Sequence, residues 1–361
     1  MASISLCMIV RDEEDVLGRC LESVKDLVDE IVIVDTGSKD HTREIARRFT
    51  ENLYDFPWID DFAAARNFSF SHAACEYCMW LDADDVITPP ERQKFLQVKE
   101  ALGPDVDVAM LRYNTGFDAQ GRVTFSYFRE RIVRNRAGML WKGAVHEVIE
   151  TRGKVRYFDC GISHKKLHPS DPDRNLRIFE KLLEQGAALD PRQQFYYGRE
   201  LYYHQRCGEA LKVFTAFLEE GQGWLENIIE ACRQCAYCWY ALGEEKKALN
   251  ALFSSFAYDL PRAETCCDIG KHFLDRELWE QAAYWYERAL ECRRQDGRGG
   301  FVLPEAYGFL PCIQLCVCYS RLGRQEEARN YNERAAGFQP DSPAVAYNRA
   351  YFESLENNRE K

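Results

Sequence analysis

The sequence lacks the features that would place a protein in a membrane or on nucleic acid. None of its 361 residues falls in an apolar run of the roughly 18 residues that a membrane span requires. Positive charge is in deficit, with 47 Lys and Arg against 58 Asp and Glu. The resulting net charge of −11 argues against binding nucleic acid by phosphate neutralisation. The first residues, Met-Ala-Ser-Ile-Ser-Leu, carry no basic segment and no cleavage site, so we expect a cytoplasmic protein.

Three catalytic signatures are also absent. No Gly-x-Gly-x-x-Gly follows the first apolar segment, which argues against a dinucleotide-binding fingerprint. That segment ends instead in the acidic run Arg11-Asp12-Glu13-Glu14, where a nucleotidyltransferase would be expected to have a basic, Gly-rich phosphate loop. His146-Glu147 lacks the second His of a HExxH zinc motif, because position 150 is Glu.

Cysteine, in contrast, is abundant, with fifteen residues. Cys232, Cys235 and Cys238 share a segment with a helical pattern and have no partner set at zinc-ribbon spacing. We therefore expect small buried thiols between packed helices, in a reduced compartment.

The first half of the chain alternates apolar strands with helical patterns. Such alternation predicts an α/β domain with a parallel sheet whose ligand lies beyond the carboxyl ends of the strands. The expected elements are strands at Ile4–Val10, Glu30–Asp35 and Met79–Asp82 and helices at Asp12–Leu27, Thr42–Phe49 and Phe62–Cys75. After Pro89-Pro90 the pattern predicts a mixed sheet with strands at Val106–Tyr113, Arg122–Tyr127, Arg131–Arg134, Val145–Thr151 and Val155–Phe158 and a hairpin turn at Asp-Ala-Gln-Gly.

The second half is wholly helical and rich in aromatic residues. Ala248 and Ala282 stand 34 residues apart, and two other steps between equivalent Ala positions are longer, which indicates inserted loops. This spacing resembles the tetratricopeptide repeat, whose small residues let paired helices approach closely. We expect about four imperfect units over residues 191–340 and a capping helix at Ser342–Asn357. The predicted organisation is an α/β domain over residues 1–168, a linker helix over 169–190 and a repeat solenoid over 191–361.

The chemistry is concentrated in Asp82-Ala83-Asp84, with Asp85 following, directly after a predicted strand. Carboxylates this close repel each other unless a cation neutralises them. A hard divalent ion, held by one or two carboxylates and completed by substrate phosphate oxygens, fits such a pair. An Asp-rich turn can also be purely structural, so the neighbouring motifs decide between the two interpretations.

Four further segments contain polar groups at predicted strand or helix ends. Arg66, among small residues at the start of a helix, has the guanidinium geometry that binds diphosphate oxygens, although a surface ion pair is its structural alternative. Either His146 or Glu147 could take a proton from an incoming nucleophile. The four segments are Met8–Glu14, Val34–Thr42, Phe62–Asn67 and Trp141–Glu147, followed by Ile162-Ser163-His164.

Taken in order, these motifs resemble the family 2 inverting glycosyltransferases with a GT-A fold. The resemblance runs from Ile4 to about His164. The catalytic domain followed by tetratricopeptide repeats is similar to the bacterial branch that includes the sublancin-type peptide S-glycosyltransferases. Members of that branch modify cysteine, serine or threonine side chains, and relatives with similar catalytic domains glucosylate lipopolysaccharide cores.

The resemblance implies a role for each matched position. Asp84 would be the principal ligand of Mn²⁺ or Mg²⁺, with Asp82 near the ribose or a metal-bound water and His164 as a further ligand. Glu147 would be the base, although the family more often has Glu-Asp where this chain has His-Glu, so His146 stays open. The nucleotide-sugar, UDP-glucose or a similar UDP-sugar, would be bound by Val10, Arg11, Asp12, Asp35, Gly37, Ser38, Arg66, Asp82 and Ala83.

Two different classes of function stay open at this point. The first is a glycosyltransferase with a peptide, protein or saccharide acceptor. The second is a non-catalytic repeat scaffold whose α/β half is a degenerate nucleotide-binding module. Hydrolysis of sugar nucleotides would separate them. The repeat half is expected to recognise the acceptor or to form a homodimer.

Overall fold

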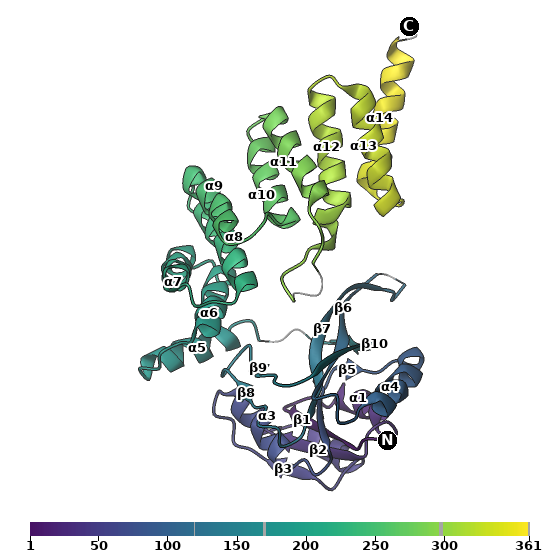
Figure 1. The fold of residues 1–361 in the computed structure, drawn as a ribbon, viewed down its shortest axis with the longest axis vertical. Coiled ribbons are helices and arrows are strands. Elements are labelled where there is room, and N and C mark those ends of the chain that lie inside the picture. Colours follow the sequence, from purple (N-terminus) through teal and green to yellow (C-terminus); the bar gives the residue numbers. More distant parts are fainter. Residues whose placement is uncertain (119, 169–170, 296–298, 360–361) are drawn as a thin grey trace. The chain divides into compact units, whose positions relative to one another are not determined.

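The computed structural model describes residues 1–118, 120–168, 171–295 and 299–359. The chain divides into two compact units, residues 1–188 and 189–361 (Figure 1), each of which is described by itself. The stretch predicted as a linker helix contains α5 (Arg174–Glu184), which falls in the first unit. Of the predicted linker and hairpin turn, residues 169–170 and Ala119 lie outside the described residues.

The first unit is built on an eight-stranded mixed sheet with the strand order β3-β2-β1-β4-β7-β6-β10-β5. The first four strands in that order are parallel, β7 is antiparallel to both of its neighbours, and β10 is parallel to β6. A separate two-stranded sheet pairs β8 with β9. The strands are β1 (Ile4–Val10), β2 (Glu30–Asp35), β3 (Leu53–Asp55), β4 (Tyr77–Trp80), β5 (Asp85–Val86), β6 (Val108–Phe117), β7 (Val123–Arg134), β8 (Trp141–Lys142), β9 (Val148–Ile149) and β10 (Val155–His164).

Both faces of this sheet are covered, as its continuous apolar strands require. On one face, side chains of α1 (Leu17–Val24) and α4 (Pro89–Ala101) pack against alternate residues of the central strands. On the other face, α3 (Phe62–Ser71) and the β8–β9 pair supply the partners, including the Trp141 ring. The remaining helix of this unit that lies between strands is α2 (Thr42–Arg47).

Several sequence-based bounds need correction. The helix expected from Asp12 begins only at Leu17, because Asp12 has a positive φ of 53° and its neighbours form a turn. The helix α4 was not predicted, since Pro89-Pro90 was interpreted as a break, whereas both prolines fit its first turn. The two strands expected over Arg122–Arg134 form one strand, β7, and the strand expected at Val145–Thr151 is only the short β9.

The second unit consists of successive helix pairs (Figure 1). Four pairs are followed by one further helix, as the repeat spacing predicts. The pairs are α6 (Pro191–Tyr203) with α7 (Cys207–Glu220), α8 (Leu225–Ala241) with α9 (Glu245–Ser254), α10 (Ala263–Leu274) with α11 (Trp279–Glu291) and α12 (Phe309–Arg321) with α13 (Gln325–Phe338), and the last helix is α14 (Pro343–Arg359).

Small residues set the close approach within these pairs. Gly198 of α6 faces the Phe214 ring so closely that an added Cβ would lie 2.6 Å from it. Gly270 of α10 faces Tyr286 in the same way, at 3.0 Å. The Ala positions that carried the repeat prediction are fully buried at 210, 248, 282 and 328. The second unit is therefore an all-α, tetratricopeptide-like solenoid.

The three cysteines expected to be buried between packed helices, Cys232, Cys235 and Cys238, are buried in α8. All fifteen cysteines are free thiols. Within the described ranges, no helix combines the length and the apolar character needed to cross a membrane.

Candidate active site

Three of the predicted site residues lie at or just after the carboxyl ends of parallel strands. β1 pairs with β2 on one side and with β4 on the other, so the direction of strand addition reverses beside β1. A crevice at such a reversal is where open α/β sheets bind ligands. Val10 ends β1, Asp35 ends β2, and Asp82 follows β4 by two residues.

The loop after β2 holds the turn after β1 in place. The Asp12 amide donates to Ser38 Oγ at 3.0 Å, and the Lys39 amide donates to Asp12 Oδ1 at 2.7 Å. Gly37 has a φ of 107°, which non-glycine residues rarely adopt, and it is exposed. Arg11 is also exposed, so this corner of the site is open to a ligand.

Asp35 is buried, and both of its carboxylate oxygens accept hydrogen bonds. Only 2% of it is exposed, and its Oδ2 accepts a hydrogen bond from Arg43 Nη1 at 2.8 Å. Its Oδ1 lies 3.1 Å from the Ser38 amide. These bonds fix the carboxylate in one orientation at the end of β2.

Arg66 is the centre of the second polar group. Its Nη2 donates to Asp82 Oδ1 at 2.8 Å and its Nε to Glu147 Oε1 at 2.7 Å. The guanidinium lies 5.0 Å from the Trp80 ring centre and 4.8 Å from that of Trp141. Two aromatic rings and two carboxylates thus surround the nearly buried guanidinium of Arg66. The guanidinium in turn fixes the positions of Asp82 and Glu147.

Hydrogen bonds between α3 and the segment before Glu147 bring Glu147 to Arg66. Asp61 caps α3 by accepting from the Ala64 amide at 2.8 Å. Asn67 exchanges two hydrogen bonds of 2.9 Å with the backbone of Trp141, and the Phe62 amide donates to the Ala144 carbonyl. Residues on both sides of Arg66 in α3 therefore form hydrogen bonds with the segment just before Glu147.

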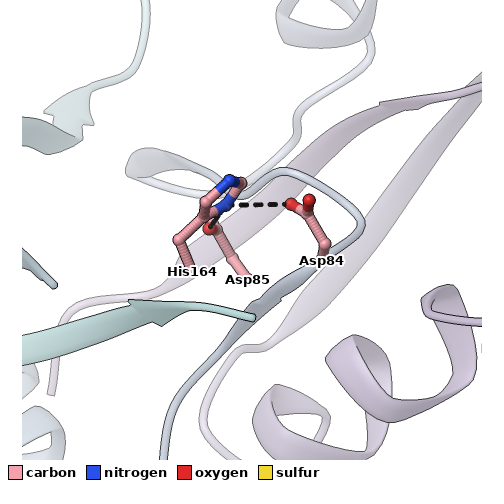
Figure 2. A group of neighbouring side chains, drawn as sticks. All are labelled: Asp84, Asp85 and His164. Carbon is pink, nitrogen blue, oxygen red and sulfur yellow. Dashed lines mark hydrogen bonds and ion pairs between the residues drawn. The ribbon is translucent and has the colours of Figure 1, made fainter. Parts of the chain in front are cut away.

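The third polar group is Asp84, Asp85 and His164, whose ligand atoms lie within 4.8 Å of one another. Figure 2 shows the imidazole pointing at both carboxylates. His164 Nδ1 is 3.1 Å from Asp84 Oδ1, 3.4 Å from Asp85 Oδ1 and 2.9 Å from the Tyr113 hydroxyl. The cluster forms because β5 and β10 pair with Asp85 directly opposite His164.

The two carboxylates dominate the electrostatics of His164. Their hydrogen bonds raise the pKa of His164 to about 10, so the imidazole is cationic at neutral pH when nothing else neutralises Asp84 and Asp85. A positive charge is thus what this cluster selects.

A buried ion pair between Arg131 and Asp85 orients the Asp85 carboxylate of the cluster. Arg131 Nη1 donates to Asp85 Oδ2 at 2.9 Å, and both side chains are fully buried. The Arg131 guanidinium lies between the rings of Trp80 and Tyr113. Since Oδ2 is engaged by Arg131, Asp85 presents Oδ1 to the cluster.

The donor set fits a divalent cation. Two carboxylate oxygens and one imidazole nitrogen converge, and carboxylates are the ligands that Mg²⁺ and Mn²⁺ prefer. Three protein donors leave further coordination positions for solvent or substrate oxygens. Binding a cation here would require the imidazole to release its proton, so affinity would fall at low pH.

Accumulated negative charge also affects two nearby carboxyls. Desolvation, followed by the charges of Asp84 and Asp82, raises the pKa of Glu13 to about 7. Desolvation alone would raise the pKa of Asp82 too, but the charges of Arg66 and Arg131 outweigh it and hold that pKa at about 2. Burial and negative charge therefore dominate at Glu13, whereas positive charge dominates at Asp82.

The structure places most of the predicted residues in three groups, and the predicted metal ligands fall into two of them. Asp84 and His164 meet as expected, with Asp85 as their third member. Asp82 lies outside that cluster, against Arg66, so its role as a metal ligand stays a prediction. The buried Ala83 joins the two groups along the chain. His146 is half-buried and has a φ of 53°, in a turn beside Glu147.

Four residues that position the site were not predicted. Predicting the role of Asp85 would have required the β5–β10 pairing. Predicting the roles of Arg43 and Asn67 would have required the packing of helices on strands. Glu13 was visible in an acidic run, but its shifted pKa depends on carboxylates about 70 residues away in sequence.

The fold and the site define an α/β enzyme domain with an acidic side-chain cluster that fits a cation, followed in the chain by a helical repeat unit. Residues 5–151 match the family model described as "Glycosyl transferase family 2". The first unit therefore carries a domain of glycosyltransferase family 2.

Two relatives are similar to parts of the chain. The chain is 40% identical over 153 residues to a TPR repeat-containing protein of Synechococcus elongatus, covering 42% of this chain and 36% of that protein. It is 27% identical over 228 residues to the SPbeta prophage-derived glycosyltransferase SunS of Bacillus subtilis, covering 58% and 51%. The chain thus spans about half or less of these curated relatives.

Among solved structures, residues 1–349 of S. aureus TarS in complex with UDP-GlcNAc are similar to the chain. The TM-score is 0.41 and the identity 12%, and the match covers 72% of this chain and 93% of that one.

Proposed function

We propose that this chain is a metal-dependent, inverting glycosyltransferase that moves a sugar from a nucleotide-sugar, a UDP-sugar, to a peptide or protein side chain. The observation that carries the proposal is the Asp84–Asp85–His164 cluster beside the Arg66–Glu147 pair, within a family 2 domain. A cation site next to a positioned carboxylate is what sugar transfer from a diphosphate requires.

The nucleoside side of the donor is assigned to the corner formed by the ends of β1 and β2. Asp35 is held rigidly by Arg43 and the Ser38 amide, and the exposed Gly37 leaves room for close approach. Asp12 locks the two loops together. A ligand there would meet preset hydrogen-bonding groups rather than order them on binding.

The diphosphate side is assigned to Asp84, Asp85 and His164. Bound there, Mn²⁺ or Mg²⁺ would supply positive charge against the developing negative charge of the leaving diphosphate. Arg66 is nearly buried and already engages Asp82 and Glu147, so we assign it to positioning these two carboxylates.

Glu147 is assigned as the base. Its Oε1 is bound by Arg66, which leaves Oε2 to accept the proton of an acceptor hydroxyl or thiol. As that proton leaves, the acceptor oxygen or sulfur forms a bond to the anomeric carbon, and the bond from that carbon to the diphosphate oxygen breaks. Attack from the side opposite the leaving group inverts the anomeric configuration. His146, one residue away, is the alternative base.

A polypeptide acceptor is supported by the combination of units. A helical repeat solenoid presents an extended surface of the kind that binds peptide segments. If the acceptor is a cysteine, the base is needed less, because a thiol is partly ionised near neutral pH. Loss of Glu147 would then reduce transfer less than loss of Asp84.

The test is transfer itself, read by intact mass. Purified chain, Mn²⁺ and a panel of UDP-sugars are incubated with peptides that each contain one Cys, Ser or Thr. A mass gain of one hexosyl or N-acetylhexosaminyl residue is expected, with Glu147→Gln reducing the rate at least tenfold on Ser or Thr. Its matched control, Glu150→Gln on the same segment, should transfer normally.

Two outcomes would contradict the proposal. Modification of oligosaccharide or glycolipid acceptors but never of a peptide would show that the acceptor is a saccharide and not a polypeptide. No transfer and no hydrolysis of any sugar nucleotide by the folded chain would favour a non-catalytic scaffold.

A further inference from the structure

The strands β6 and β7 form a long hairpin, and one edge of it has little strand pairing (Figure 1). β6 pairs with β7 along nearly the whole length of both strands. On its other side, β7 pairs with β4 only at residues 132–134. In the part of the chain that the structure describes, residues 123–131 of β7 therefore have a strand on one side only. A free strand edge presents a row of N–H and C=O groups that can pair with another extended chain.

The free part of β7 lacks the residues that usually prevent such pairing. Its sequence over residues 123–129, Val-Thr-Phe-Ser-Tyr-Phe-Arg, contains no Pro and no Lys, and its single charged residue is the last one. β-branched and aromatic residues of this kind favour an extended conformation. Phe125 and Tyr127 are each 37% exposed. Since natural edge strands are normally covered or blocked, this edge is suited to pairing with a partner strand.

The direction of the backbone groups on this edge follows from Glu130. The Trp80 indole N–H donates to the Glu130 carbonyl at 2.5 Å, so this carbonyl points towards β4 and away from β6. Backbone groups of a strand alternate in direction with a period of two, and the register from Glu130 to Ser126 is unbroken. The N–H and C=O groups of Phe128 and Ser126 therefore point to the free side, whereas those of Tyr127 face β6.

The free edge begins beside the proposed base. The Trp80 ring that reaches Glu130 also lies 5.0 Å from the Arg66 guanidinium, and Arg66 binds Glu147. From there, residues 123–129 extend over about 20 Å at the usual rise per residue. A chain paired with this edge would therefore lead to the Arg66–Glu147 pair.

A row of aromatic rings leads from the cation cluster to the same strand. The Tyr113 hydroxyl is 2.9 Å from His164 Nδ1. The ring centres of Tyr113 and Tyr127 are 5.7 Å apart, and those of Tyr127 and Phe125 are 5.8 Å apart. Aromatic side chains stabilise cross-strand pairs with the side chains of a neighbouring strand. The row would thus contact alternate side chains of a chain that pairs with β7.

We propose that the free edge of β7 binds the acceptor polypeptide as an added β-strand, which places the side chain to be glycosylated beside Glu147. This role rests on the proposed function, whose acceptor it specifies. Backbone N–H and C=O groups recur at regular intervals in a polypeptide, whereas a saccharide has no such series. Main-chain hydrogen bonds supply the affinity in strand addition, and the exposed rings of Phe125 and Tyr127 select among the side chains of the acceptor.

The first test compares two substitutions at one position. Ser126→Pro removes an N–H that points to the free side, where a strand tolerates proline. Ser126→Ala keeps that N–H and removes a buried hydroxyl that has no hydrogen-bond partner among the described residues. With the peptide of the transfer panel that is modified fastest, Ser126→Pro should raise KM about tenfold, because a main-chain hydrogen bond is lost. Ser126→Ala should leave KM unchanged, and neither variant should change the hydrolysis of UDP-sugar without acceptor.

The second test changes the same peptide instead of the protein. Methylating one backbone nitrogen at a time removes single N–H donors from the peptide. In an added strand only every second N–H faces β7, so methylation should raise KM at alternate residues and have little effect at those between them. If Ser126→Pro also lost hydrolysis through misfolding, this methylation profile would decide alone.

The outcomes separate this role from the proposed function. Peptide transfer with an unchanged KM in a folded Ser126→Pro variant, or with a methylation profile that does not alternate, would overturn strand addition and leave the proposed function standing. Transfer to no peptide would overturn strand addition together with the polypeptide acceptor. A concentration-dependent dimer that Ser126→Pro dissociates would also overturn it, because the edge would then pair with a second copy.

Discussion

Arg66 joins two carboxylates to which the sequence assigned different roles. Its position in an Ala-Arg-Asn motif predicted a role at the site, and the structure places it between Asp82 and Glu147. Its partners could not be predicted, because Glu147 lies 81 residues further along the chain. We assign Arg66 a positioning role, because its Nε and Nη2 each donate a hydrogen bond to a different carboxylate, those of Glu147 and Asp82.

The acidic motif at residues 82–85 predicts a cation site but does not show which of its carboxylates face that site. Their spacing predicted a cation site, and the cluster with His164 supports that prediction. Which carboxylate faces the cluster depends on the two-residue strand β5, which is too short to leave a periodic pattern. The pairing of β5 with β10 turns Asp85 towards His164, while Arg66 binds Asp82.

Glu13 gives the site a pH dependence that can be tested. Its folded pKa, about 7, is raised from 4.5, so the folded state favours the protonated form. The penalty for ionising it is absent below pH 4.5, grows as pH rises from there and is complete above pH 7. In chelator-treated protein, Glu13→Gln should therefore increase the free energy of unfolding at pH 8 by about 1–2 kcal/mol, after allowance for solvent screening.

The measurement is urea unfolding at pH 4.5 and pH 8. The control is Glu14→Gln, an exposed neighbour. An equal gain at both pH values, or destabilisation at pH 8, would show that burial and the neighbouring carboxylates do not penalise the ionised form of Glu13.

Among the elements, the buried parallel strands were predicted most accurately. The observed β1 and β2 have the bounds expected from their apolar runs. The helix α4 was missed because its signal is two prolines, which mark both breaks and helix starts. The joining of two expected strands into β7 depends on pairing with β6 and β4, which the sequence alone does not encode locally.

The repeat helices depend on glycine at their contact points. Gly198→Ala should destabilise the chain by about 1–3 kcal/mol, because the added methyl group would overlap the Phe214 ring. Gly208→Ala on α7 is the matched control. It has nothing within 4 Å of the added atom, so it should be neutral or slightly stabilising. Thermal unfolding followed by circular dichroism makes the comparison, and equal melting temperatures would refute the close-packing account.

For the whole molecule, the order of motifs predicted the α/β unit and the small-residue spacing predicted the solenoid. Both predictions succeeded because they depend on periodic burial. The segment at residues 299–303 left no such pattern, so its contacts with α6 and α10 came only from the structure. The family match likewise covers residues 5–151 and says nothing about the repeat unit.

The cluster of Asp84, Asp85 and His164 is proposed to hold the cation that allows the bond from sugar to diphosphate to break. Without that charge, loss of the leaving group should slow by a factor of about 100 or more.

The most direct measurement is hydrolysis of UDP-sugars without acceptor, followed by release of UDP, with Mn²⁺ or with chelator. We expect hydrolysis that requires Mn²⁺ and is lost in Asp84→Asn, which should remain folded by circular dichroism. Asp105→Asn, an exposed carboxylate of the same unit, should retain it. Equal hydrolysis by Asp84→Asn and the unmodified chain, or full activity in chelator, would contradict the account.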